Sequence, residues 1–355
     1  MSRFLHTRYQ NLVPYVPGEQ PRERTYIKLN TNESPFPPSP RAVAAAKAEA
    51  ERLQLYSDPT AKALNEAFAG VVGVSPDEVM ATNGSDEILD FAFMAFCGKD
   101  RPAVFPDVTY GFYPVFADLH GVPYTVVPLK EDFTVDVDGL CAAPGTVFLA
   151  NPNAPTGIAL PPSTVEKILQ AHPNDVVVVD EAYVDFGAAS CVPLLRKYEN
   201  LLVTQTFSKS RSMAGARLGF GIARAEIIRD LQTIRNSTNP YNVNRMTLAA
   251  GVGALADEAY TKRNCRTIVE TREFCTHALQ KLGFEVVPSQ TNFLFVRSPK
   301  IEGEELYLAL RERGILVRHF SAPRLNDYNR VTVGSRAEME TFLSAVEIIL
   351  KEKRT

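Results

Sequence analysis

The sequence has few of the features that mark disulfide-bonded, metal-binding or membrane proteins. Its five cysteines are scattered and no two form a CxxC pair, so we expect reduced, cytosolic thiols that mostly pack in the core. Its five histidines form no HxH or HxxxH pair, which argues against a metal site built from protein ligands. No apolar run approaches the ~20 residues of a membrane-spanning helix, so we expect no membrane partner.

A basic field is also missing. The formal net charge is −3 at pH 7, so binding to nucleic acid has no electrostatic support. The opening MSRFLHTRYQNLVPY contains no apolar core of the signal-peptide kind, and we expect a cytoplasmic protein. What is present is an ordinary globular composition, with 45% hydrophobic and 22% charged residues. A length of 355 residues predicts two domains, or one large domain with a smaller one.

Short apolar runs alternate with helical patterns over most of the first 250 residues. The runs predict strands at 102–105, 123–127, 146–150, 175–180 and 201–206. The helical patterns lie at 62–70, 85–97, 111–119, 163–171 and 224–234. This alternation predicts an α/β fold with a mostly parallel central sheet and helices on both faces. The run DVVVVDE lacks polar alternation, as expected for a strand buried on both faces.

The pattern changes near residue 250. A long helical stretch at about 254–282 precedes the segments FEVVPSQTNFLFV, GILVR and RVTVG. Two further helices are predicted near 303–313 and 335–351. We therefore expect a smaller α+β domain at 251–355.

The N-terminal segment is rich in proline. Four prolines within 35–40 keep it extended. Ser39 and Pro40 then form a cap and first turn, and the alanine-rich run predicts a helix as far as Gln54. We expect residues 1–40 to form an arm and residues 41–250 to form the large domain.

Several polar segments follow the predicted strands. In ATNGSDEILDF, Ser85 and Asp86 open a helix whose free N–H groups favour an anion, often a phosphate. The same segment is also typical of an ordinary capped helix that binds no anion. Tyr110, just past a strand, is suited to stack on a planar ring or to pack in the core. NPNAPTG, at 151–157, has the composition of a common loop.

Two segments carry charge at strand ends. Asp180, in DEAY, closes a buried strand, where an open parallel sheet faces its ligand, although a strand can simply end in acids. Lys209 follows another strand, and a desolvated lysine becomes a nucleophile toward carbonyl carbons. Thr206, Ser208 and Arg217 beside it suit a phosphate. A phosphate cradle, a carboxylate, an aromatic ring and this lysine together match the needs of pyridoxal 5′-phosphate.

With these segments in this order, the sequence resembles the fold-type I, class I and II pyridoxal-phosphate aminotransferases. The signature SKSRSMAGAR carries the resemblance, with DEAY and NPNAPTG upstream of it. It extends over nearly the whole chain, from LVPY and LNTNESPF to RVTVGSR. Within the family the chain is most similar to the histidinol-phosphate group. The resemblance implies an obligate homodimer whose sites are completed in trans.

The resemblance also implies roles for single residues toward the cofactor. Lys209 would carry it as an internal aldimine and move a proton between Cα and C4′. Asp180 would pair with the ring nitrogen, Tyr183 would hydrogen-bond the ring oxygen, and Tyr110 would stack on the ring. The residues expected at the phosphate are Ser85 and Asp86 through their N–H groups, Thr206, Ser208, Arg217 and, from the partner subunit, Tyr56.

Four further residues match the family's substrate pocket. Arg330 and Arg318 would bind the anionic groups of the substrate, Tyr15 would reach the pocket from the arm, and Asn32 would lie beside the site. One position departs from the family pattern NPNNPTG, because Ala154 stands where an asparagine bonds the ring oxygen. Either Asn153 replaces it or the tyrosine of DEAY holds that oxygen alone.

The function that the resemblance implies is a ping-pong transamination. L-Histidinol phosphate and 2-oxoglutarate would give imidazole-acetol phosphate and L-glutamate, a step of histidine biosynthesis. Two alternatives of the same family stay open, an aromatic amino-acid aminotransferase and a threonine-phosphate decarboxylase. A pyridoxal-phosphate-sensing regulator with an added DNA-binding domain is disfavoured, because the match begins near residue 10 and the net charge is negative.

Overall fold

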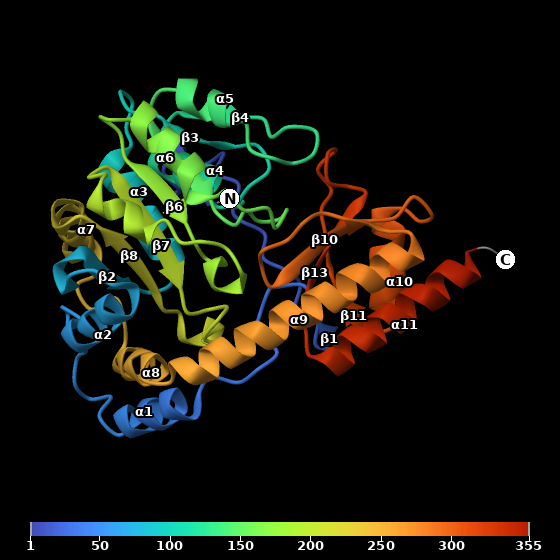
Figure 1. The fold of residues 1–355 in the computed structure, drawn as a ribbon. Helices are drawn as coiled ribbons and strands as arrows, with labels where there is room; N and C mark the ends of the chain where they lie inside the picture. The colour runs from blue at the N-terminus through green and yellow to red at the C-terminus, as the bar shows by residue number, and fades with distance from the viewer. Residues whose placement is uncertain (1, 354–355) are drawn as a thin grey trace.

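The computed structural model describes residues 2–353, which contain a large sheet, a small sheet and a separate pair of short strands (Figure 1). The large sheet has seven strands, in the order β2 (Val79–Thr82), β8 (Gly219–Ala223), β7 (Leu201–Thr206), β6 (Val177–Asp180), β5 (Thr146–Ala150), β3 (Ala103–Pro106) and β4 (Tyr124–Val127). β8 runs antiparallel to both of its neighbours, and every other pair is parallel. The predicted mostly parallel sheet is therefore confirmed.

Five of the seven strands lie where the apolar runs predict them, but β2 and β8 were not predicted. β8 has the sequence GFGIA, and its glycines hide the strand pattern. The packing explains the first of them. A Cβ on Gly219 would lie 2.3 Å from the backbone nitrogen of Ser85, where a helix begins. β8 can therefore pass this helix start only if residue 219 is glycine.

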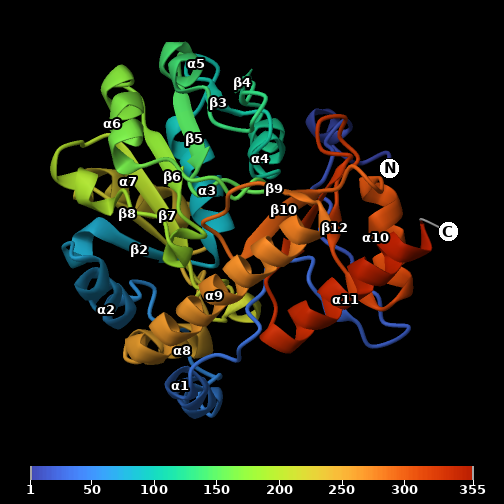
Figure 2. The same cartoon turned by 45° about the vertical axis from the view of Figure 1, so that its right-hand side comes forward.

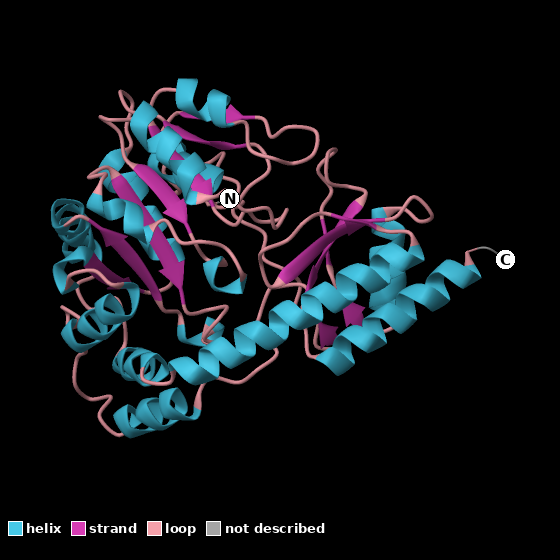
Figure 3. Cartoon of the chain, in the orientation of Figure 1, coloured by secondary structure: helices cyan, strands magenta, loops and turns pink. Residues whose placement is uncertain are grey.

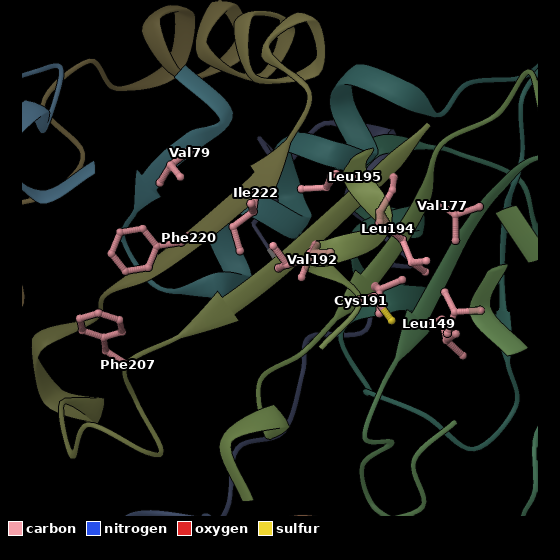
Figure 4. Packing of buried hydrophobic residues seen from close by; sticks show 14 of the residues in the cluster. Val79, Leu149, Val177, Cys191, Val192, Leu194, Leu195, Phe207, Phe220 and Ile222 are labelled. Carbon is pink, nitrogen blue, oxygen red and sulfur yellow. The ribbon is translucent and has the colours of Figure 1, made fainter. Parts of the chain in front are cut away.

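Helices cover both faces of the large sheet, as Figure 3 shows. They are α1 (Pro40–Ala50), α2 (Lys62–Val72), α3 (Ser85–Phe96), α4 (Tyr113–His120), α5 (Val137–Ala142), α6 (Pro162–Ala171) and α7 (Ala225–Thr238). In β6, Val177 and Val179 pack in the hydrophobic cluster on one face and Val178 in the cluster on the other. Figure 4 shows part of the first cluster, including Val177 of β6 and Leu149 of β5. The DVVVVDE strand is thus buried on both faces, as predicted.

The small sheet is antiparallel, with four strands in the order β12 (Arg318–His319), β13 (Tyr328–Thr332), β10 (Phe293–Arg297) and β9 (Glu285–Val286). The helices of this half of the chain are α9 (Glu258–Leu282), α10 (Gly303–Glu312) and α11 (Arg336–Glu352), whereas α8 (Arg245–Leu255) packs against α1 and α2. α9 runs from the edge of the large sheet to the small one in both views (Figures 1 and 2). The arm joins this layer, because β1 (Ile27–Lys28) pairs with β11 (Ile315–Leu316).

Two predicted helix boundaries were wrong. The helix expected from Pro40 to Gln54 ends at Ala50, after which the chain continues in turns. The stretch expected at 254–282 is divided, because the chain leaves the helical path at Asp257 and α9 starts at Glu258. Short 3₁₀ helices complete the fold: η1 (Thr7–Tyr9), η2 (Pro76–Glu78), η3 (Val184–Phe186), η4 (Val192–Arg196) and η5 (Ala214–Ala216).

The large sheet lies within 41–250 and the small sheet within 251–355, while the division into domains at those residues stays a prediction. Over residues 2–353, none of the helices combines the length and the apolar character that a bilayer crossing requires. The same described range holds no cluster of three or more metal-binding side chains of the His, Cys, Asp or Glu type.

Candidate active site

The carboxyl ends of the parallel strands form one edge of a cavity. β5, β6 and β7 end at Ala150, Asp180 and Thr206, and the chain after each strand turns around the same space. The cavity has a volume of about 90 Å³. It is lined by Ser85, Asp86, Tyr110, Ala150, Pro152, Ala154, Asp180, Ala182, Tyr183, Thr206, Ser208, Lys209 and Arg217. Nearly all of the predicted cofactor residues therefore meet in one place.

Lys209 lies just past the end of β7, on the wall of this cavity. Its Nζ donates a hydrogen bond to the carbonyl oxygen of Thr31 at 3.4 Å and lies 5.9 Å from the ring centroid of Tyr183. Burial, and after it the positive charge of Arg330, lower the pKa of Lys209 to about 8. A substantial fraction of neutral amine is therefore present near neutral pH, as a lysine nucleophile requires.

Asp180 is held by three donors at the end of β6. The N–H of Ala182 and the hydroxyl of Thr204 donate to its Oδ1 at 3.1 and 3.2 Å, and the hydroxyl of Tyr113 approaches its Oδ2 at 3.4 Å. Burial raises the pKa of Asp180 to about 6. A buried carboxylate with this pKa is suited to pair with a protonated ring nitrogen. Sequence reasoning missed Thr204 and Tyr113, although Thr204 lies two residues before Thr206 on the same strand.

The start of α3 and Arg217 form the opposite end of the cavity. Gly84 has a φ of +85°, and a Cβ there would lie 2.5 Å from Nη2 of Arg217. Because Gly84 has no side chain to cap α3, the first N–H groups of the helix remain available to an anion. Thr206 donates its hydroxyl hydrogen to Ser208 Oγ at 2.9 Å in the same region. This set of donors suits a phosphate group.

Asp86 has a contact that the sequence did not predict. Only its backbone N–H was expected to matter, but its carboxylate forms an ion pair with Arg217 at 2.8 Å. The other carboxylate oxygen accepts a hydrogen bond from the hydroxyl of Tyr110 at 2.6 Å. Tyr110 is thereby fixed over the cavity, where its ring can cover a planar molecule.

A larger groove of about 850 Å³ adjoins the cavity, and the four predicted substrate residues Tyr15, Asn32, Arg318 and Arg330 line it. Arg330 donates from Nη2 to the carbonyl oxygen of Asn30 at 3.2 Å, whereas its Nε is buried without a hydrogen-bond partner in the described part of the chain. A buried donor that lacks a partner is costly, so its natural complement is an acceptor on a ligand.

The other three residues are held by the arm and the neighbouring loops. Arg318 donates to the carbonyl oxygens of Val16 and Pro17 at 3.2 and 3.3 Å. Tyr15 stacks on Phe112 with ring centroids 4.4 Å apart. Each contact fixes the arm over the groove, so the arm forms one of its walls.

Asn32 is the residue that links the arm to the cavity. It has a φ of +55°, an uncommon conformation that asparagine tolerates better than most residues. Its Nδ2 donates to the hydroxyl of Tyr183 at 2.9 Å, and its Oδ1 accepts from the hydroxyl of Thr332 at 3.1 Å. The orientation of Tyr183 therefore depends on the arm and on β13.

Tyr56 lines neither the cavity nor the groove of its own subunit. Its side chain is 80% exposed and stacks on Tyr241 at 4.6 Å. Arg245 holds this segment by donating to the carbonyl oxygen of Tyr56 at 2.8 Å. The structure does not bring Tyr56 into the cavity of the same chain.

Comparisons with known proteins agree with this geometry. A model of the family "Aminotransferase class I and II" matches residues 24–346. The chain belongs to the class I and II aminotransferase family. A "Histidinol-phosphate aminotransferase 2" of Dechloromonas aromatica (strain RCB) is 49% identical over 354 residues, covering 98% of this chain and 99% of the relative. A "Histidinol-phosphate aminotransferase 1" of Pseudomonas aeruginosa is 44% identical, covering 98% of this chain and all of the relative (100%).

Solved aminotransferase structures have the same fold. The histidinol-phosphate aminotransferase of Sinorhizobium meliloti, in complex with pyridoxal-5′-phosphate, superposes with a TM-score of 0.84 at 27% identity, covering 93% of this chain and 92% of that one. The enzyme of the same name from Clostridium acetobutylicum gives a TM-score of 0.85 at 22% identity, covering 92% and 99%, and shows the fold alone. The predicted α/β fold class is confirmed.

One predicted contact of this aminotransferase needs correction. Asn153 was a candidate to replace the family asparagine at the cofactor ring, but it does not line the cavity. Its Nδ2 donates to the carbonyl oxygen of Val108 at 2.9 Å and to the hydroxyl of Thr156 at 3.1 Å. Its Oδ1 accepts from Thr109 at 3.0 Å, so the whole amide is used inside the loop. Ala154 lines the cavity instead.

Proposed function

We propose that this aminotransferase uses pyridoxal 5′-phosphate to transfer the amino group of L-histidinol phosphate to 2-oxoglutarate, giving imidazole-acetol phosphate and L-glutamate. The observation that carries the proposal is the pair Arg318 and Arg330 in the groove beside Lys209, with the Nε of Arg330 buried and unpartnered. Two guanidinium groups suit a phosphate or a carboxylate. The names of the relatives support the phosphorylated donor and a place in histidine biosynthesis.

The cavity fits the cofactor group by group. Arg217, Ser208 and the N–H groups at the start of α3 would hold the phosphate, and Asp180 would hold the proton on the ring nitrogen. Tyr110 would cover the ring, and Tyr183 would donate to the ring oxygen without help from an asparagine. When bound, pyridoxal 5′-phosphate supplies an electron sink for the bonds at the substrate Cα.

Lys209 is the residue that moves the proton. Its Nζ, on the cavity wall, would accept the proton that leaves the substrate Cα and would release it again within the same cavity. The lowered pKa of about 8 matches this duty, because the amine must accept and release a proton near neutral pH. A positioned general base of this kind contributes ~10²–10⁴-fold to the rate.

The assembly that we propose is a homodimer in the cytoplasm. Tyr56 is exposed and stacked on Tyr241, away from its own cavity. In a dimer this tyrosine would reach the phosphate of the neighbouring subunit's cofactor. Sedimentation of the holoprotein should then give twice the mass of one chain, and a monomer with full activity would exclude this part of the proposal.

The test is a comparison of amino donors on the purified holoenzyme. L-Histidinol phosphate with 2-oxoglutarate should form glutamate ~10–100-fold more efficiently than phenylalanine does, since a lost charge-assisted contact costs ~1.5–3 kcal/mol. Preference for phenylalanine would replace the phosphorylated donor with an aromatic one. Release of CO2 from threonine phosphate, without glutamate, would replace transamination with decarboxylation.

A further inference from the structure

Phe133 extends from the layer of the large sheet to that of the small sheet. It lies on the loop between β4 and α5, with its N–H donating to the carbonyl oxygen of Lys130 at 3.0 Å. Its ring is only 5% exposed and stands edge-on to Phe295 and Tyr328, at centroid distances of 5.7 and 5.3 Å. Its φ is +64°, which is unusual for a bulky residue. Such a conformation persists where the surroundings hold it in place.

Arg324 extends in the opposite direction, from the layer of the small sheet to that of the large sheet. It lies on the loop between β12 and β13, and its Nη1 bonds Asp107 Oδ2 at 3.1 Å and the carbonyl oxygen of Leu129 at 3.0 Å. Its Nη2 also donates to the carbonyl oxygen of Lys130. The guanidinium carbon lies 5.2 Å from the ring centroid of Phe133. We call these two side chains the Phe133–Arg324 clasp.

The hydrophobic core is continuous through the clasp. Phe295, Leu325 and Tyr328 come from the small-sheet half of the chain but belong to the same buried cluster as Phe133 and Leu129. The opposite face of the small sheet packs in a separate cluster, which contains Leu294, Val296 and Val331. The clasp therefore joins the large layer to the face of the small sheet that looks toward it.

Strand register connects the clasp to the groove. Phe295 is the direct cross-strand partner of Arg330, and Arg330 is in turn opposite Arg318. Residues that face each other across antiparallel strands lie on the same side of the sheet. Tyr328 also shares this face, because it lies two residues before Arg330. A shift of the clasp thus shifts both arginines relative to the cavity.

We propose that the Phe133–Arg324 clasp sets the distance between Arg330 and Lys209, so that Phe133 and Arg324 are positioning residues for the amino donor. The proposal rests on the proposed function for the identity of that donor. A second contact between the layers, from the N–H of Gln290 to the carbonyl oxygen of Gly157 at 2.9 Å, lies elsewhere. Loss of the clasp should therefore loosen the groove without separating the two layers.

The variant that tests the clasp is Arg324→Gln, which removes a partly exposed charge. We expect the KM for the amino donor to rise about tenfold, with kcat within about twofold of wild type. The reason is that a smaller fraction of the enzyme would hold Arg330 at the distance from Lys209 that binds the donor. The matched control is Arg297→Gln. Arg297 also lies against Tyr328, at 5.4 Å from its ring, but pairs with Glu285 within the small sheet. It should leave KM unchanged.

Hydrogen exchange on the holoenzyme gives a readout that needs no amino donor. Arg324→Gln, and Phe133→Leu as a second variant, should speed amide exchange in segments 129–134 and 321–327 at least about threefold over Arg297→Gln. Equal KM values in Arg324→Gln and Arg297→Gln, or unchanged exchange in both clasp variants, would overturn the clasp. If the wild-type enzyme ignores histidinol phosphate but exchange still responds, the proposed donor fails and the clasp stands.

Discussion

The cavity around Lys209 and the groove around Arg330 are built in different ways. In the cavity the charged groups already have partners, since Asp180 accepts from three donors and Asp86 is paired with Arg217. In the groove the Nε of Arg330 is buried and has none among the described residues. The cavity is formed by strand ends of one rigid sheet, whereas the groove lies between the two sheets and the arm.

This difference indicates which half of the site is prepared in advance. A pocket whose charged side chains are already held by partners costs little reorganisation when its ligand arrives. A pocket with an orphaned donor gains most when an acceptor enters. We therefore expect the cofactor end to keep its geometry throughout the cycle, and the substrate end to be completed by each substrate in turn.

The largest effect should come from Lys209→Ala. Turnover should fall at least ~10²–10⁴-fold, because the general base at the substrate Cα is lost. Steady-state assays measure this, with Lys351→Ala as the control, since Lys351 pairs with Glu347 at 2.8 Å on α11. Circular dichroism should show an intact fold in both variants. Near wild-type turnover of Lys209→Ala would exclude its role.

The next effect should come from the groove. Arg330→Gln should raise the KM of the phosphorylated donor ~10–100-fold, since a hydrogen bond to a charged group is worth ~1.5–3 kcal/mol. Cofactor affinity, followed by absorbance, should change little. Arg318→Gln should have the smaller effect, because its guanidinium already donates to two backbone carbonyl groups. The reverse order of the two KM values would contradict the account of the groove.

The two regions are coupled through the pKa of Lys209. Its neutral form captures the cofactor, so the capture rate of the apoprotein should rise with pH and level off above about 8. The charge of Arg330 lowers this pKa, so Arg330→Gln should move the midpoint to higher pH. Stopped-flow absorbance from below to above this pH measures both profiles. A capture midpoint at lower pH in Arg330→Gln than in the wild type would contradict the predicted effect of the Arg330 charge on the pKa of Lys209.

The smallest effect should come from the departure at position 154. Ala154→Asn adds a side-chain amide on the cavity wall and should tighten cofactor binding up to ~tenfold, the value of one hydrogen bond of ~0.5–1.5 kcal/mol. Asn153→Ala is the contrasting variant. It should lower the melting temperature, because that amide holds the loop through Val108 and Thr156. Equal cofactor affinities in Ala154→Asn and the wild type would show that Tyr183 alone suffices.

The residues of the cavity follow from strand pattern for a physical reason, whereas the four groove residues were predicted only through the family resemblance. Asp180, Thr206 and Lys209 follow apolar strands, and parallel strands bring their carboxyl ends together wherever the pattern is recognised. β8 was missed because its glycines serve a close approach rather than a β pattern. The contacts of Asn153 were also hidden, since a loop pattern does not tell which way an amide points.

The contacts between the two layers could not be predicted from the sequence pattern alone. Phe133 and Arg324 are far apart in sequence, and nothing in their neighbourhoods marks a crossing between two sheets. Thr204 and Tyr113 support Asp180 from a neighbouring strand and from α4. Such partners depend on tertiary packing, which a single sequence does not show.

The most direct test of the account is an absorbance scan of the purified holoenzyme, titrated first with L-histidinol phosphate and then with 2-oxoglutarate. The visible absorbance of the bound cofactor should fall on the first addition and return on the second, because the amino group enters the site and then leaves it. A spectrum that responds to glutamate but ignores histidinol phosphate would contradict the proposed donor. A protein that gains no visible absorbance from pyridoxal 5′-phosphate would contradict the role of Lys209.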